Sequence, residues 1–505
     1  MSESEDMEFE NPGATITGVG IGLPEKRIHL SELEEEVKKG GYNSEKSGPY
    51  ADFCGRKFGT EYVYIAKEEE TSDLIAKACN EAMEYSGLNP RDIEMFVMST
   101  ITPDNTTAGT RGKVMEKVNL FDIPGYELNH GCIGFIPTLR IAADFVEKYD
   151  LNALAGSGDT LRKKRVSDSN FIMAGLIGNG SGGVTIGSCE PGYGVLEFRG
   201  RDEFQINPAW FNDAKTDPET GEFVMDGASL KQRVKPKFKK MVHDALEYYG
   251  IDPSIERIHL VPHQVNGSLL SDIHPELLQE LADKYSSGIT DNINMVQFIN
   301  VVNQYCNCSN GSPPIGLYHA LKSGEVQRGD YVFIFGVGAG FDLGIIGFRA
   351  DRYYGQKKKV HVAVVDDDKT VGGGVARQLA KSLLDTYAHR DPEFDSKIQI
   401  VPHFYTNGND FLIRSQTEGP FAAVIMDYKM PQKDGLETAS EFHPKSPETP
   451  IFIHSAYIDG TNIGVFNKAH EAGIFEEIIN KPFTEEHFKQ IKNGIFNYLD
   501  RTGQD

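Results

Sequence analysis

EYSGLNP at residues 84–90 returns as EYYGIDP at residues 247–253, and this repetition indicates how most of the chain folds. In each copy a helix-periodic apolar segment runs up to the glycine, the residue that most readily ends a helix. An apolar strand follows each proline, at residues 93–100 and 258–261. Two copies of one helix–turn–strand unit predict two α/β halves made by duplication. Because helices and strands alternate, we expect parallel sheets.

Between the two copies lies NHGCIGF, residues 129–135. Cys132 stands between two glycines and directly before an amphipathic segment with Pro137 in its expected first turn. A helix N-terminus favours a thiolate over a thiol, and the thiolate is the nucleophile. A lone cysteine in such a place is more often a buried structural residue. The alternative, that Cys132 is a nucleophile, is supported by a histidine and an asparagine in suitable positions elsewhere in the chain.

Three further polar segments follow apolar strands in the second half. They are VPHQVN at 261–266, CNCSNG at 306–311 and GVGAGF at 336–341. Open α/β sheets place their sites at the carboxyl ends of strands. His263 alone could be a hydrogen-bonded histidine at a strand end, and Cys306 with Cys308 forms only a weak metal-binding pattern.

Residues 1 to about 354 resemble the β-ketoacyl-ACP synthase III branch of the thiolase-fold condensing enzymes. The similarity rests on motifs that occur in the family's order: GVGIGLPE at 18–25, GCIGF at 131–135, VPHQVN at 261–266, CNCS at 306–309 and GAGF at 338–341. The resemblance implies a duplicated, five-layered αβαβα thiolase fold over residues 13–351. It also implies a homodimer with Cys132, His263 and Asn307 as catalytic residues.

The chemistry implied by the resemblance begins with transfer of an acyl group from acyl-CoA or an acyl carrier protein to Cys132. The N–H groups of Cys132 and Gly340 are the expected oxyanion hole. Decarboxylation of a malonyl-type thioester would give an enolate, which neutral His263 and Asn307 would hydrogen-bond, and the product would be a β-ketoacyl thioester. Two alternatives stay open: acyl transfer to an alcohol or amine, and a non-catalytic signalling or scaffold protein.

Several positions depart from the family's pattern. By the resemblance, Phe53 and Lys57 occupy the coenzyme A side of the pocket, where the family has a tryptophan and an arginine. Thr107 falls near the phenylalanine that a partner subunit inserts at the floor of the acyl pocket. These changes predict a specialised lipid or secondary-metabolite pathway with a longer acyl chain.

Beyond residue 360 a new alternation begins, and four apolar strands each end in polar residues. Residues 360–365 precede Asp366 and Asp367; the other strand ends lead to Asp427, Ser455 and Lys481. Carboxylates gathered at one sheet edge repel one another and call for a divalent cation such as Mg²⁺.

This segment closely resembles a two-component response-regulator receiver domain, which implies a doubly wound (βα)₅ fold. The matching motifs are VVDD at 364–367, DYKMP at 427–431 followed by DG at 434–435, SA at 455–456 and KPF at 481–483. Asp427 would then accept a phosphoryl group from a histidine kinase or phosphotransfer protein. Asp366, Asp367 and the Lys429 carbonyl would complete an Mg²⁺ site with Asp427, and Ser455 and Lys481 would contact the phosphoryl group. Phosphorylation would regulate or localise the enzyme.

Composition narrows the function further. The 505 residues carry a formal net charge of −23, which argues against nucleic acid and anionic membranes as partners. Six cysteines without framework-like spacing, no signal peptide and no membrane-length apolar run indicate the cytosol. We expect no redox cofactor. Residues 1–12 are acidic and predicted to be disordered, 352–359 form a linker, and 360–505 form the receiver domain.

Overall fold

The computed structural model describes residues 13–196, 204–205, 214–225, 227–285, 295–338, 343–355, 358–368, 375, 398–455, 463–481 and 483–502. The chain divides into two compact units, residues 1–355 and 356–505. The predicted disordered segment, residues 1–12, lies outside the described residues.

The first unit contains two large sheets of the same design. In the first, the order is β1-β7-β6-β4-β5, and in the second it is β13-β12-β14-β15-β8. The strands of the first are β1 (Gly13–Gly22), β4 (Met95–Ser99), β5 (Gly125–Leu128), β6 (Ala153–Asp159) and β7 (Gly180–Cys189). Those of the second are β8 (Gly194–Val195), β12 (Ile258–Pro262), β13 (Val296–Phe298), β14 (Tyr331–Val337) and β15 (Leu343–Arg349). The strand after each repeated motif, β4 or β12, occupies the same place in its sheet, so the duplication is confirmed.

Each sheet is mixed, and the expectation of parallel sheets is therefore wrong in part. β4 runs parallel to β5 and β6, as β12 does to β13 and β14. β7 and β15 run antiparallel to both of their neighbours. Between β14 and β15 lie only residues 338–342, too few for the crossover that a parallel pair requires.

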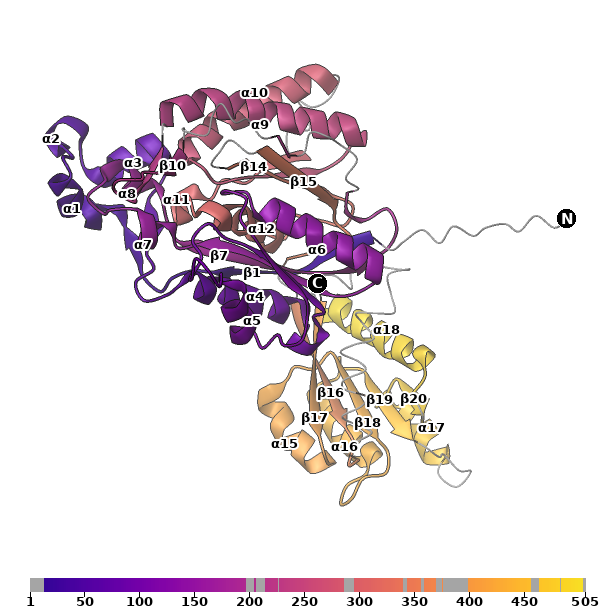
Figure 1. The fold of residues 1–505 in the computed structure, drawn as a ribbon. Helices are drawn as coiled ribbons and strands as arrows, with labels where there is room; N and C mark the ends of the chain where they lie inside the picture. Colours follow the sequence, from indigo (N-terminus) through magenta and orange to yellow (C-terminus); the bar gives the residue numbers. More distant parts are fainter. Residues whose placement is uncertain are drawn as a thin grey trace. The chain divides into compact units, whose positions relative to one another are not determined.

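Helices form three layers around the two sheets (Figure 1). α4 (Thr71–Ser86) and α5 (Arg111–Lys117) cover the outer face of the first sheet, and α9 (Gly227–Tyr249) and α10 (Gly267–Tyr285) that of the second. α6 (Phe135–Tyr149) and α12 (Ser312–Lys322) lie between the sheets in one continuous buried core. The amphipathic segment predicted after Cys132 is helix α6. Its apolar side chains Phe135, Leu139, Ala143 and Val146 are fully buried in that core.

Shorter elements surround the layers. They are β2 (Arg27–His29), α1 (Glu34–Lys39), α2 (Ser44–Ser47), α3 (Tyr50–Phe58), β3 (Tyr62–Tyr64), α7 (Leu161–Arg165), α8 (Phe171–Leu176), β10 (Ala214–Thr216), β11 (Phe223–Met225) and α11 (Val302–Tyr305). A sixth strand of the second sheet, β9 (Phe204–Gln205), also pairs with β15. α3 and α8 share an apolar cluster with β11, and this cluster forms one wall of the site described below.

The predicted linker is too long at both ends. Tyr354 is fully buried in the core between the two sheets, and its ring packs edge-on against Phe348. The next strand, β16, already begins at Lys358. Burial of an aromatic ring fixes residues 352–355 to the first unit, a contact that the local composition does not reveal.

The second unit is a five-stranded parallel sheet in the order β17-β16-β18-β19-β20. Its strands are β16 (Lys358–Val365), β17 (Ile398–Tyr405), β18 (Ala423–Asp427), β19 (Ile451–Ser455) and β20 (Glu477–Asn480). The described helices are α15 (Gly408–Glu418), α16 (Gly435–Phe442), α17 (Ile463–Glu471) and α18 (Glu485–Thr502). This order is that of a doubly wound sheet whose site lies at the carboxyl ends of the strands. The sequence analysis did not locate β17.

Candidate functional site

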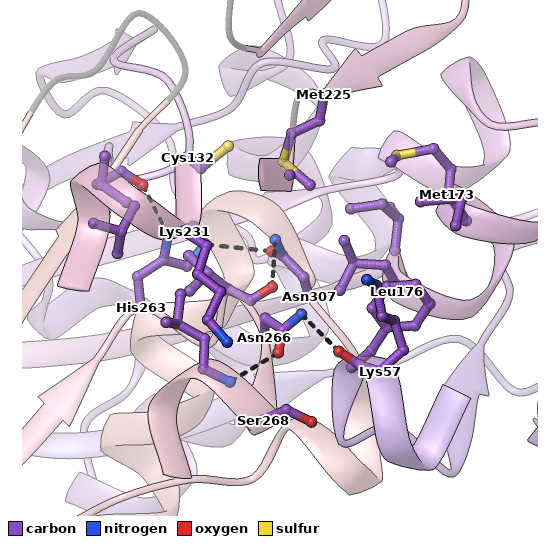
Figure 2. A pocket seen from close by; sticks show the side chains of 18 of the residues that line it. Lys57, Cys132, Met173, Leu176, Met225, Lys231, His263, Asn266, Ser268 and Asn307 are labelled. Atoms are coloured by element: carbon purple, nitrogen blue, oxygen red, sulfur yellow. Dashed lines mark hydrogen bonds between the residues drawn. The ribbon is translucent and has the colours of Figure 1, made fainter. Parts of the chain in front are cut away.

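A cavity of about 980 Å³ in the first unit brings Cys132, His263 and Asn307 into one lining. The three residues come from segments far apart in the sequence: the turn before α6, the end of β12, and the loop after α11. Figure 2 shows them around the same space. The sequence motifs that predicted a site are thus assembled by the duplicated fold.

Cys132 occupies a tight turn whose glycines are required by sterics. It is 8% exposed. Gly131 has φ +56°, and a Cβ on Gly134 would lie 1.7 Å from the Ser99 hydroxyl oxygen. Helix α6 begins at Phe135, with Gly134 as its N-cap. The expected placement of Cys132 just before a helix N-terminus agrees with this geometry.

His263 is the buried histidine at the end of β12. Its Nδ1 lies 2.9 Å from the carbonyl oxygen of Val337 in β14, and its Nε2 lies 3.3 Å from Oδ1 of Asn307. Burial lowers the pKa of His263 to about 4, so the ring is neutral near pH 7. Both ring nitrogens face oxygens that can only accept, and we assign the single ring proton to Nδ1 because its contact is the shorter one, which leaves a lone pair on Nε2.

This tautomer changes one expectation drawn from the sequence. A neutral His263 with its proton on Nδ1 cannot donate to an enolate oxygen from Nε2. Nε2 can instead accept a proton, after which the ring can donate. In the neutral ring the lone pairs of Nε2 and Asn307 Oδ1 face each other and repel. Protonation of Nε2 replaces this repulsion by a hydrogen bond.

Asn307 is held in place from several directions. Its Oδ1 accepts the backbone N–H of Ser309 at 2.9 Å, and its Nδ2 lies 3.5 Å from the Val265 carbonyl oxygen. The preceding Cys306 has φ +59° and ψ −165°, a conformation that is essentially restricted to glycine. The Cys306 side chain is buried, and its thiol donates to the Tyr62 carbonyl at 3.1 Å. The backbone that presents Asn307 is therefore strained.

The sequence analysis missed a supporting network behind Cys132. Asn310 accepts the N–H of Gly134 through Oδ1 at 2.8 Å and donates from Nδ2 to Asp159 at 3.1 Å. Asp159 is fully buried and also accepts the backbone N–H groups of Ile101 and Thr102. The network ties the Cys132 turn to the Asn307 loop. The polar triplet SNG at 309–311 was its only local signal.

The cavity wall is apolar on one side and cationic near its rim. Phe58, Leu161, Met173, Leu176, Ile177, Phe223, Met225 and Leu269 supply apolar lining. Arg56, Lys57, Lys231 and Lys235 also line it. In Figure 2, Lys57 and Ser268 lie in the lower part of the view, Lys231 lies near its middle, and Cys132, Met173 and Met225 lie in the upper part. Such a cavity suits an acyl chain with an anionic head.

Three further predicted residues take different positions. Phe53 does not line the described cavity; its ring packs against Tyr42 and Phe58 in the α3 cluster. Thr107 is exposed in the segment before α5. Gly340, the second expected oxyanion-hole donor, lies outside the described residues. The neighbouring Gly338 is described, and a Cβ there would lie 3.2 Å from the Cys132 nitrogen.

The second unit gathers a carboxylate pair and a lysine at the strand ends. Lys481 Nζ lies 3.1 Å from Asp427 and 3.4 Å from Asp366. Burial raises the pKa of both carboxyl groups, and Lys481 opposes this rise. Two buried carboxylates beside one ammonium group leave room for a further positive charge, so these residues fit the Mg²⁺ that receiver domains bind. Bound there, Mg²⁺ would neutralise carboxylate charge.

The other predicted receiver residues lie around this pair. Asp367 and Lys429 are exposed, and Ser455 is buried at the end of β19. Ser455 pairs in register with Asn480, and its carbonyl accepts the N–H of Lys481 at 3.0 Å. Ser455 and Lys481 are thus adjacent at one sheet edge.

His454 belongs to the same cluster and was not predicted. It is 2% exposed, its Nδ1 lies 3.8 Å from Asp366, and its ring centroid is 4.0 Å from that of Phe483. Burial lowers the pKa of His454 to about 3, with Lys481 and His487 adding to the effect. A histidine as the penultimate residue of an otherwise apolar strand was the available signal.

Comparison with known proteins gives two family matches. Residues 255–350 match the C-terminal domain of 3-oxoacyl-[acyl-carrier-protein] synthase III, and residues 362–492 match the response regulator receiver domain. The chain is 29% identical over 344 residues to β-ketoacyl-[acyl-carrier-protein] synthase III of Caldanaerobacter subterraneus, covering 66% of this chain and 96% of that protein. The same enzyme of Clostridioides difficile is 27% identical over 346 residues, covering 66% of this chain and 97% of that protein.

A solved structure shares the fold of the first unit. The 3-oxoacyl-[acyl-carrier-protein] synthase III of Aquifex aeolicus superposes with a TM-score of 0.56 at 23% identity, covering 67% of this chain and 100% of that one. The described helices include none that is long and apolar enough to cross a membrane.

The first unit has the thiolase fold, and the second is a parallel α/β receiver. More closely, the first unit is a β-ketoacyl-ACP synthase III-like domain, and the second contains a response-regulator receiver domain.

Proposed function

We propose that this enzyme forms an acyl-Cys132 thioester and condenses it with a malonyl-type thioester, with loss of CO₂, to give a β-ketoacyl product. The observation that carries the proposal is that Cys132, His263 and Asn307 line one cavity, with Nε2 of His263 left as a proton acceptor by the bond to Val337.

In the first half-reaction the Cys132 sulfur attacks the acyl carbonyl of a donor thioester. The bond from carbon to the donor sulfur breaks, and the thiol proton passes through His263 Nε2 to the departing thiolate. The Cys132 N–H lies at the elbow, where it can hydrogen-bond the developing oxyanion, and Gly340 is the proposed second donor.

In the second half-reaction the carboxylate carbon of the malonyl group leaves as CO₂, and its bonding electrons form an enolate. The Asn307 amide donates to the enolate oxygen, and His263 donates as well when it is protonated. The enolate carbon attacks acyl-Cys132, the carbon–sulfur bond breaks, and the Cys132 thiolate takes up one proton from solvent. No redox cofactor is required.

The lining suggests the kind of donor. The apolar wall suits a medium or long acyl chain, and Arg56, Lys57, Lys231 and Lys235 suit the phosphates of coenzyme A or of a carrier-bound phosphopantetheine. Phe53 packs in the α3 cluster instead of lining the described cavity, which favours an acyl carrier protein as donor. We assign the enzyme to a specialised lipid or secondary-metabolite pathway in the cytosol.

We also propose a homodimer through the edge strand β5. Large apolar side chains near this edge are exposed: Phe121 by 64%, Tyr126 by 48% and Tyr149 by 57%. An exposed sheet edge flanked by aromatic residues is suited to pairing with a second copy of the chain. Tyr126→Lys should then shift the mass measured by sedimentation from dimer to monomer.

Mass spectrometry of the intact protein tests the condensation. Incubation with an acyl thioester should add one acyl group, and a malonyl-type thioester should discharge it with a new β-ketoacyl product. Discharge by an alcohol or amine, without malonyl-dependent product, would instead favour simple acyl transfer. Absence of any adduct across short and long acyl donors would favour a non-catalytic signalling role.

We propose that Asp427 accepts a phosphoryl group from a histidine kinase or phosphotransfer protein and that this modification regulates condensation. Phosphate adds about −1.5 to −2 charges and strong acceptors within reach of Ser455 and Lys481. A modification changes activity only if it favours one of two arrangements. Beryllofluoride with Mg²⁺ should therefore alter the condensation rate of the natural enzyme and leave that of Asp427→Asn unchanged. An unchanged natural enzyme would limit the receiver to localisation.

A further inference from the structure

The receiver site contains a row of three potential metal ligands on neighbouring strands. Asp427 and His454 are register partners in β18 and β19, and Asp366 follows directly after the register pair Val365–Met426 of β16 and β18. In-register side chains of adjacent strands point to the same face of a sheet. Asp366, Asp427 and His454 therefore converge at one edge.

The distances fit a shared ion. One ligand atom from each of the three residues lies within 4.8 Å of the others. His454 Nδ1 is 3.8 Å from Asp366 Oδ2, which is beyond hydrogen-bond range. Two ligands at about 2.1 Å from one ion lie about 3 to 4 Å apart, depending on the angle between them. The gap between imidazole and carboxylate thus has the size that a bound cation requires.

The imidazole is buried without satisfying its own hydrogen-bonding capacity. His454 is 2% exposed, and its Nε2 has no hydrogen-bond partner among the described residues. A buried, unpaired imidazole is costly, and a leucine of similar size would fill the place beside Phe483 without that cost. Nδ1 is the nitrogen that faces Asp366, so a metal bound there would give the imidazole a bond on that side, with the ring proton on Nε2.

Imidazole nitrogen alters which metal is preferred. Mg²⁺ favours oxygen ligands, whereas Mn²⁺, Fe²⁺, Co²⁺ and Zn²⁺ accept mixed nitrogen and carboxylate sets with increasing affinity toward the end of the series. We infer that Asp366, Asp427 and His454 form a transition-metal site in the receiver domain, in which His454 Nδ1 adds affinity for these ions but not for Mg²⁺. This goes beyond the proposed phosphorylation, which Mg²⁺ alone could support.

Lys481 is the built-in competitor for this site. Its ammonium group bridges Asp427 and Asp366 at 3.1 and 3.4 Å. A metal ion must displace that ammonium group from at least one carboxylate. Removal of the lysine charge should therefore raise the affinity for every divalent ion, which is the opposite sign to removal of a ligand.

The test is equilibrium dialysis of the full chain, freed of metal by chelation, against Co²⁺, Mn²⁺ and Mg²⁺, with the visible absorption of Co²⁺ recorded in parallel. The natural protein should bind Co²⁺ at least about 10-fold more tightly than Mg²⁺. His454→Leu should lose about 10- to 100-fold in Co²⁺ affinity and change the Co²⁺ spectrum. Its Mg²⁺ affinity should change by less than about twofold, since the carboxylates remain.

Two further variants keep the outcome decisive. Lys481→Met should bind both ions more tightly, and Asp427→Asn should bind both more weakly. An unchanged Co²⁺ affinity and spectrum in His454→Leu would overturn the inference, because the cobalt would then be bound elsewhere, for example by thiols. Equal losses for Co²⁺ and Mg²⁺ would overturn it as well and give His454 a structural role.

A phosphorylation assay distinguishes failure of this inference from failure of the proposed function, on which the inference does not depend. In the His454→Leu variant, Asp427 should still accept a phosphoryl group from acetyl phosphate in the presence of Mg²⁺. Failure of the natural protein to accept phosphate would refute the proposed receiver chemistry while leaving the metal measurements valid.

Discussion

The Val337 carbonyl oxygen lies 2.9 Å from Nδ1 of His263, and this contact sets the chemical state of the histidine. It places the ring proton on the side away from Asn307, while burial keeps the ring neutral. His263 can therefore accept a proton before it donates one, which separates its role from that of Asn307.

Replacing Cys132 by alanine should abolish the acyl adduct, because the nucleophilic sulfur is lost. Cys189→Ala is the matched control, since Cys189 is a partly exposed thiol in β7 that does not line the described cavity. Intact-mass spectrometry should show full acylation of the control and none of Cys132→Ala. An adduct on Cys132→Ala would mean that another nucleophile is acylated.

Asn307→Ala and His263→Ala should affect the two half-reactions differently. Asn307 acts on the enolate alone, so its loss should slow condensation by about 10² to 10³, or roughly 2.7–4 kcal/mol, and leave acylation near normal. His263 also transfers the Cys132 proton, so its loss should slow both steps.

Rapid-quench measurement of acylation and condensation in separate experiments distinguishes these effects. If His263→Ala acylates at the natural rate, the proton acceptor is another group. Loss of acylation in Asn307→Ala would contradict the division of roles.

Acidification should destabilise the fold through His263. Its folded-state pKa is about 4, below the ordinary value of 6.5, so only the unfolded chain takes up this proton between those values. The free energy of unfolding should therefore fall as pH drops below about 6.5, by about 2 kcal/mol at pH 5. Denaturant titrations at pH 7 and 5 should show a smaller loss for His263→Gln than for the natural protein. Equal losses would show that His263 is not kept neutral by the fold.

Cys306 provides a direct test of backbone strain. Cys306→Ala and Cys306→Gly both remove the buried thiol, but only glycine accepts φ +59° and ψ −165° without strain. Glycine should therefore be the more stable of the two by about 1–3 kcal/mol, against its ordinary disadvantage to alanine. Urea unfolding of the pair measures the difference. A more stable alanine variant would show that the backbone is relaxed at this position.

Asp427→Asn should prevent phosphorylation by acetyl phosphate in the presence of Mg²⁺, because an amide is a poor nucleophile for phosphorus. Asp367→Asn should weaken Mg²⁺ binding, so that phosphorylation requires a higher Mg²⁺ concentration, while the acceptor Asp427 remains. Phosphate-affinity electrophoresis separates the modified from the unmodified protein. Phosphorylation of Asp427→Asn at a natural rate would place the acceptor elsewhere.

Much of the fold was predictable because it is encoded locally. The repeat at 84–90 and 247–253 contains its own helix stop and turn, so it specified two equivalent halves without knowledge of their packing. The strand directions were only partly predicted, since pairing partners and the short connection between β14 and β15 are properties of the sheet. Tyr354 was assigned to a linker because its burial depends on contacts with strands far away in the sequence.

Which chemical groups are available follows from the amino-acid order alone: a cysteine between glycines, a histidine and an asparagine at predicted loop positions, and carboxylates after apolar strands. What surrounds these groups depends on how the chain folds. The Val337 carbonyl fixes the tautomer of His263, Asn310 and Asp159 fix the Cys132 turn, and register between β18 and β19 places His454 beside Asp427. Side-chain identity is local, whereas burial, protonation state and ligand geometry arise from segments that meet only when the chain folds.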